Sequence, residues 1–140
     1  MYLPLDRVTG KPVDSPSIGG LLPVFAPIPR PRAAALAATI RDIGRRVRFL
    51  VPSHDPRDDR FDVKRYWRGP VWLVCNYLIA DGLAAAGESA VAGQIIEHSL
   101  VLITQSGFAE YYDPNDGSPL GGGRFSWTAA MVLEFLEGGA

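Results

Sequence analysis

The sequence predicts an all-α domain of helical hairpins that forms part of a ring. Three observations support this fold class. Four segments have the periodicity or composition of helices, no segment shows a convincing β pattern, and long connections alternate with a short one. A ring of helical hairpins with its long loops gathered at one mouth has this layout. The 140 residues, 47% of them hydrophobic, suffice for one domain with a real core.

The first helix is expected over Pro31–Ile43, after a loop-rich N-terminal segment with a short helix around Leu21–Ala26. Its composition is rich in alanine. One apolar stripe at helical spacing comprises Leu36, Thr39, Ile40 and Ile43. Gly44 is a plausible end.

The strongest helix prediction is Pro70–Ala86, with Pro70 in the first turn and Gly87 at the end. Apolar residues cover most of its circumference, which is typical of a helix buried in a larger assembly. We therefore expect it to leave apolar surface in water if the rest of a ring is missing. The next helix, 88–105, follows after about two residues, so the pair should form an antiparallel hairpin.

Two long loops flank this hairpin, and a final helix is expected from Ser126 to about Leu136. Long loops in compact domains are often functional. The first, 51–65, contains a charged cluster, Arg57–Arg60, that we interpret as a solvated tip. The second, 108–124, is rich in Tyr, Asp, Pro and Gly.

Composition excludes several classes. A net charge of −1 argues against nucleic-acid and anionic-membrane partners. Neither a signal peptide nor an apolar run long enough to span a bilayer is visible, so we expect a cytoplasmic protein. Cys75 lies in an apolar run and is expected to be a buried, inert thiol. The segment Asp113–Gly117 is a turn signature without the ligand pattern of a calcium loop, so neither a metal nor a cofactor is expected.

Two segments combine aromatic residues with charge and glycine, as a sugar site requires. They are Tyr66–Trp72 and 107–127. Aromatic rings pack against the C–H face of a sugar, while a few polar groups bind its hydroxyls. Alternatively, the three tryptophans fill the core where loops meet helices. The three glycines Gly121–Gly123 indicate backbone flexibility or close approach of a ligand.

Glu110 is the carboxylate of most interest, because Phe108 and the Tyr111–Tyr112 pair flank it. Inverting cleavage of a glycosidic bond needs one carboxylic acid on the leaving oxygen and a second carboxylate that deprotonates water. A single glutamate in a loop is, however, more often an ordinary surface residue.

At these two segments the sequence resembles glycoside hydrolase family 63, within it the bacterial mannosylglycerate and glucosylglycerate hydrolase branch. The resemblance rests on three stretches and covers about residues 18–136. They are Tyr66–Trp72 with Asn76–Leu78 and Gly82–Leu83; Glu110–Pro114; and Gly121–Arg124 with Phe125–Ala130. The resemblance implies an (α/α)6 barrel and hydrolysis of a small α-glucoside or α-mannoside with inversion.

The resemblance also implies residue roles. Glu110 is the general base. The sugar-binding wall comprises Tyr66, Trp67, Arg68, Gly69, Trp72, Tyr111, Arg124 and Trp127. The family's general acid is an aspartate in an upstream segment, and none of the acidic residues before Tyr66 lies in a matching motif.

We therefore interpret residues 1–140 as one partial domain, the C-terminal third of the barrel. The expected partners are a small carbohydrate substrate and the missing N-terminal part, from the same gene or a separate chain. Alone, the chain should be weakly active or inactive, and marginally stable or oligomeric. Two alternatives stay open: a trehalase-like or debranching-type (α/α)6 glycosidase, and a non-catalytic helical module that binds carbohydrate or protein.

Overall fold

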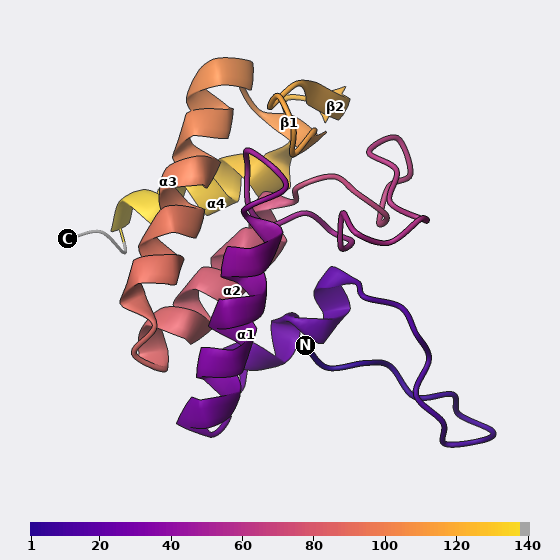
Figure 1. The fold of residues 1–140 in the computed structure, drawn as a ribbon. Coiled ribbons are helices and arrows are strands. Elements are labelled where there is room, and N and C mark those ends of the chain that lie inside the picture. The colour runs from indigo at the N-terminus through magenta and orange to yellow at the C-terminus, as the bar shows by residue number, and fades with distance from the viewer. Residues whose placement is uncertain (138–140) are drawn as a thin grey trace.

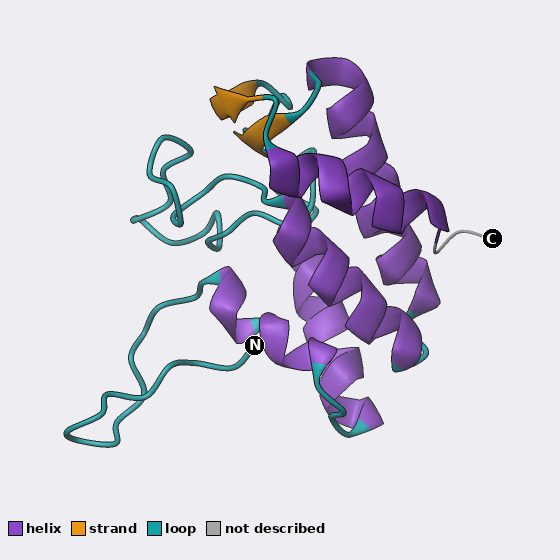
Figure 2. Cartoon of the chain, turned by 180° about the vertical axis from the view of Figure 1, so that it is seen from behind, coloured by secondary structure: helices purple, strands orange, loops and turns teal. Residues whose placement is uncertain are grey.

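The computed structural model describes residues 1–137 and consists of four α-helices, two short 3-10 helices and one β-hairpin (Figure 1). In chain order these elements are η1 (Ile18–Gly20), η2 (Leu22–Phe25), α1 (Arg30–Ile43), α2 (Leu73–Ala85), α3 (Ser89–Ser106), β1 (Ala109–Tyr112), β2 (Pro119–Gly123) and α4 (Ser126–Glu137). The three longest non-helical segments extend from one side of the helices (Figure 2). The long loops therefore share one side of the molecule.

Helix α2 is the centre of the domain and packs against α3, α4 and η2. Its buried side chains include Leu73, Ile79 and Leu83. The chain's own elements cover most of this helix, but Val74, Tyr77 and Leu78 are only partly buried, so one side of it still exposes apolar surface, as expected. More strongly exposed apolar side chains lie on α4, where Leu133 and Leu136 each expose 63% of their surface.

Helix α2 begins at Leu73 and not at the predicted Pro70, because Val71 is extended. Val71 forms isolated bridges with Pro52 on one side and Tyr112 on the other. Three segments far apart in the sequence are therefore joined at the N-terminal end of α2. Trp72 occupies the position before the helix with an extended backbone.

Asn76, the polar interruption in the apolar run, fixes the preceding loop to α2. Its Nδ2 donates to the carbonyl of Leu50 at 2.9 Å and to Ser99 Oγ at 2.8 Å, and its Oδ1 accepts from the amide of Val51 at 3.0 Å. A buried amide with its hydrogen bonds made costs little and specifies one packing. Cys75 beside it is buried, and burial raises the pKa of its thiol to about 11, as expected for an inert cysteine.

The β-hairpin corrects the all-α prediction. Strands β1 and β2 are antiparallel, and the turn between them closes through a bond from the amide of Gly117 to the carbonyl of Asp113 at 2.9 Å. Sequence periodicity did not reveal them because β1 has only four residues and β2 contains three consecutive glycines. Glycine contributes no side chain to an alternating pattern.

Candidate active site

The β-hairpin carries Glu110 at an irregular point of the strand pairing. Ala109 pairs with Gly123 and Tyr111 with Leu120, so two residues of β2, Gly121 and Gly122, lie opposite Glu110. A bulge of this kind changes the direction of a side chain and is common next to active sites.

Gly121 of β2 makes room for the Glu110 carboxylate. A Cβ at Gly121 would lie 2.6 Å from Glu110 Oε2, and its φ of +69° also favours glycine. The amide of Gly122 donates to the same oxygen at 3.2 Å. The sequence left open backbone flexibility or close approach of a ligand at these glycines; in the structure, the group close to Gly121 is the side chain of Glu110.

The other oxygen of Glu110 binds the second segment that the sequence singled out. Tyr66 Oη donates to Glu110 Oε1 at 2.6 Å, and this bond raises the pKa of the Tyr66 phenol. Glu110 is half-buried and its carboxylate receives one neutral donor on each oxygen. These donors fix the orientation of the carboxylate and leave further lone pairs free to accept a proton.

An aromatic cluster of Tyr66, Trp67, Trp72 and Tyr111 surrounds this contact. The rings of Trp67 and Trp72 are stacked, with centroids 4.6 Å apart and planes inclined by 16°. Tyr66 and Tyr111 each lie 4.8 Å from the Trp72 ring. Trp67 exposes 46% of its surface, whereas Trp72 exposes 1%. Trp67 thus presents an exposed aromatic surface, and the buried ring of Trp72 packs against its other face.

The remaining predicted wall residues occupy different positions. Gly69 is buried, and a Cβ there would lie 2.7 Å from the backbone of Asp62, so this glycine permits the loop to close on itself. Arg68 is exposed, and its backbone accepts from the amide of Asp62 at 2.7 Å. Arg124 lines a hollow of about 410 Å³ together with Phe108.

Trp127 does not join the aromatic cluster. It lies in the first turn of α4, exposes 55% of its surface, and its ring centroid lies 5.7 Å from that of Phe125. The proposal that all three tryptophans fill the core therefore holds only for Trp72. The structure brings Glu110 together with Tyr66, Trp67, Trp72 and Tyr111, and it places Trp127 elsewhere.

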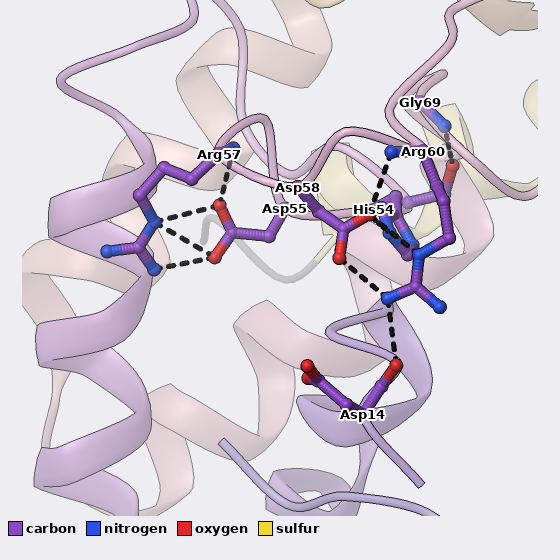
Figure 3. A network of polar contacts seen from close by, with 8 residues as sticks. Asp14, His54, Asp55, Arg57, Asp58, Arg60 and Gly69 are labelled. Atoms are coloured by element: carbon purple, nitrogen blue, oxygen red, sulfur yellow. Dashed lines mark hydrogen bonds and ion pairs between the residues drawn. The ribbon is translucent and has the colours of Figure 1, made fainter.

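The loop that presents Tyr66 is fixed at its base by the polar network shown in Figure 3. Arg57 Nε donates to Asp55 Oδ1 at 2.9 Å, and Arg60 Nη2 donates to Asp58 Oδ2 at 2.6 Å and to the carbonyl of Asp14 at 2.8 Å. Arg57 also pairs with Asp42 of α1. The cluster is exposed at Arg57, Asp59 and Arg60, as predicted for a solvated tip, and its polar contacts also join it to α1 and to the N-terminal segment.

Sequence reasoning missed two polar groups of this region. Ser53 is fully buried, and its Oγ accepts from the amide of Gly69 at 3.0 Å, which joins the two ends of the loop. Nothing in the sequence distinguishes this serine. His54, also buried, has Nε2 3.2 Å from Asp58 Oδ1. Sequence reasoning also missed the amide of Gly122 as a donor to Glu110, although it had singled out the three glycines.

Three of the carboxylates upstream of Tyr66 are committed to structural contacts. A hydrogen bond from Arg57 lowers the pKa of Asp55, and hydrogen bonds from Arg60 lower the pKa of Asp58. A hydrogen bond from Arg45 lowers the pKa of Asp42. A general acid requires a raised pKa, so these aspartates are unsuited to that role.

Residues 1–137 contain neither a metal site nor a membrane span. No group of three or more His, Cys, Asp or Glu side chains there is arranged to hold a metal ion. No helix in this part of the chain is long and apolar enough to cross a membrane.

Comparison with known proteins gives consistent matches. Residues 1–128 match the mannosylglycerate hydrolase MGH1-like glycoside hydrolase domain. A mannosylglycerate hydrolase of Thermus thermophilus is 41% identical over 133 residues, which are 94% of this chain and 32% of that protein. The glucosylglycerate hydrolase of Mycolicibacterium hassiacum is 41% identical over 87 residues, 62% of this chain and 20% of that protein.

A solved structure is similar over nearly the whole chain. It is a GH63 mannosylglycerate hydrolase of Thermus thermophilus in complex with glucose, with a TM-score of 0.92 and 41% identity. The match covers 97% of this chain and 34% of that protein. This chain thus spans about a third of the length of the relatives that it matches.

Proposed function

Because this chain belongs to the mannosylglycerate hydrolase MGH1-like family of glycoside hydrolases, we propose that it supplies the general base and part of the sugar-binding wall of an inverting α-glycosidase. Its substrate is a small α-mannoside or α-glucoside such as mannosylglycerate or glucosylglycerate. The relatives named for these two activities support this substrate class.

The observation that carries the proposal is the environment of Glu110. Its carboxylate is held between Tyr66 Oη and the amide of Gly122, and the ring of Tyr66 lies 5.8 Å from the partly exposed ring of Trp67. In an inverting reaction such a carboxylate accepts a proton from the water that attacks the anomeric carbon. Fixed orientation matters because positioning supplies much of the rate.

Some of the wall residues are exposed and can contact a sugar, whereas others are buried and support the exposed ones. Trp67 and Tyr111 are the aromatic surfaces available to the C–H face of a sugar, and Tyr66 adds a half-exposed hydroxyl. Trp72 and Gly69 are buried and shape the wall from behind. Arg68 and Arg124 are exposed cations at its edge, suited to an anionic aglycone such as a carboxylate.

The general acid comes from outside this chain. Asp42, Asp55 and Asp58 are paired with arginines and have lowered pKa values. We accordingly place the second carboxylate of the reaction in the two thirds of the relatives' length that this chain does not span.

The same missing portion completes an (α/α)6 barrel. Leu133 and Leu136 of α4 and Val101 of α3 expose apolar surface, a feature typical of faces that pack on further helices. The hairpin α2–α3 and the long loops on one side are the parts of a barrel expected from a third of its length.

Reconstitution tests this function. The chain is combined with the N-terminal two thirds of the Thermus thermophilus relative, and hydrolysis of mannosylglycerate, glucosylglycerate and trehalose is followed by NMR. We expect hydrolysis of the first two with release of the β anomer, and little activity from the chain alone, since loss of a general acid costs roughly 10²–10⁴-fold. Robust hydrolysis by the chain alone would show that the acid is present. Release of the α anomer would exclude an inverting reaction.

A further inference from the structure

Trp72 is enclosed by other aromatic rings and is out of reach of a ligand. It exposes 1% of its surface, and Tyr66, Trp67 and Tyr111 pack around it with centroids 4.8, 4.6 and 4.8 Å away. A sugar cannot stack on this indole while these three rings are in place. Trp72 must serve the site in another way.

The indole nitrogen of Trp72 contacts the backbone of the residue that binds Glu110. Trp72 Nε1 donates to the carbonyl of Tyr66 at 3.0 Å. Tyr66 has a φ of +21°, at the edge of the left-handed region, which residues with a side chain rarely adopt. Such a conformation persists only where the surroundings hold it. The bond from Trp72 is a direct restraint on this backbone.

Trp72 is itself anchored to rigid structure. It directly precedes α2, and its carbonyl accepts the helix bond from the amide of Asn76 at 3.0 Å. Val71 next to it is bonded to Tyr112 of β1 in both directions, at 2.8 and 3.0 Å. The position of the indole N–H is thus fixed relative to the central helix and to the hairpin that carries Glu110. Groups on regular elements are placed more precisely than groups on loops.

We propose that Trp72 is a positioning residue: its indole N–H holds the Tyr66 backbone so that the Tyr66 phenol meets the Glu110 carboxylate. The path runs from Trp72 Nε1 to the Tyr66 carbonyl and from Tyr66 Oη to Glu110 Oε1. The catalytic meaning of this path rests on the proposed function, but the contact itself can be measured without a sugar.

The reporter is the pKa of the Tyr66 phenol in the 140-residue chain. Selective ¹³C labelling of tyrosine Cζ gives one NMR titration curve per tyrosine, and Tyr66→Phe identifies the signal. Glu110→Gln removes the charged acceptor and sets the pKa of a phenol without this contact. Trp72→Phe keeps an aromatic ring and removes the N–H, and we expect it to lower the Tyr66 pKa to nearly the value in Glu110→Gln.

A matched control and a second variant make this result specific. Trp67→Phe changes the indole stacked on Trp72 at 4.6 Å and should leave the Tyr66 pKa close to that of the unmodified chain. If Trp72→Phe does not fold, benzothienylalanine at position 72 replaces only the N–H by sulfur, and its effect on Tyr66 should be the same. An unchanged Tyr66 pKa in whichever of the two folds would overturn the proposal.

Kinetics of the reconstituted enzyme separate this inference from the proposed function. A positioning role predicts that Trp72→Phe lowers kcat with little change in KM, whereas a sugar-stacking role predicts a raised KM. If every variant and the unmodified enzyme are inactive on glycosides, the proposed function fails, while a lowered Tyr66 pKa in Trp72→Phe still supports the contact.

Discussion

Segment 53–69 takes part in two opposite kinds of carboxylate site. In the first half, Asp55 and Asp58 are paired with Arg57 and Arg60, and their pKa values are lowered. In the second half, Tyr66 brings a neutral hydroxyl to Glu110. Paired charges stabilise a loop, whereas a carboxylate bound by neutral donors keeps its charge uncompensated and can serve as a base. The paired aspartates therefore stabilise the loop, whereas the carboxylate bound by Tyr66 is the one available for catalysis.

The largest expected effect is loss of the base. Glu110→Gln in the reconstituted enzyme should reduce kcat by roughly 10²–10⁴-fold, because the amide cannot accept a proton from water. Initial rates of mannosylglycerate hydrolysis measure this effect. Asp59→Asn, at an exposed position of the supporting half, is the matched control and should leave kcat unchanged. A Glu110→Gln enzyme with nearly full activity would remove the distinction between the halves.

Breaking the supporting half should affect stability. Asp55 is buried and accepts hydrogen bonds from both the backbone and the side chain of Arg57. Asp55→Asn should therefore lower the free energy of unfolding by about 2 kcal/mol, the scale of hydrogen bonds to a charged group. Urea unfolding of the chain measures this, again with Asp59→Asn as control. The Tyr66 pKa should not move in Asp55→Asn, and a large shift there would show that the halves are coupled.

Acid should reproduce part of this loss. The folded pKa of Asp55 is below its ordinary value, so its contribution to stability is complete above the unfolded pKa of about 4 and is lost as the pH falls through the folded pKa. The stability difference between the unmodified chain and Asp55→Asn should shrink as the pH is lowered below about 4. Urea midpoints at neutral and acidic pH test this. A difference that grows on acidification would contradict the direction of the shift.

The smallest expected effect concerns Tyr66 alone. Tyr66→Phe removes the donor to Glu110 Oε1 but keeps the ring that packs on Trp72. We expect kcat of the reconstituted enzyme to fall about tenfold, the scale of one lost hydrogen bond to a charged group, with little change in the urea midpoint. Tyr111→Phe is the matched control, because it alters a neighbouring phenol of the same cluster. Equal effects of the two variants would contradict a specific role for Tyr66.

Much of this organisation was accessible from the sequence. The helical hairpin, the two aromatic segments and the resemblance to glycoside hydrolase family 63 were predicted, and the family is confirmed. Helical periodicity and the residues that end a helix depend on neighbouring residues. The sequence therefore predicts the four helices with small errors at their ends. The three consecutive glycines suggested flexibility or the approach of a ligand, whereas the group close to Gly121 is the side chain of Glu110.

What the sequence could not give depends on pairing between distant segments. The bridge of Val71 to both Pro52 and Tyr112 shortens α2 and creates the contact between Tyr66 and Glu110. The hairpin was missed because its second strand is mostly glycine. The burial of Trp72 and the ordered network at Asp55 arise from tertiary contacts that no local pattern records.

The most direct measurement is azide rescue of a Glu110→Ala variant in the reconstituted enzyme, with the configuration of the glycosyl azide read by NMR. If Glu110 is the base of an inverting reaction, azide occupies the space of the lost carboxylate and its water, and a β-glycosyl azide accumulates from the α-glycoside. Failure of azide to restore cleavage, or formation of the α-glycosyl azide, would contradict the role assigned to Glu110.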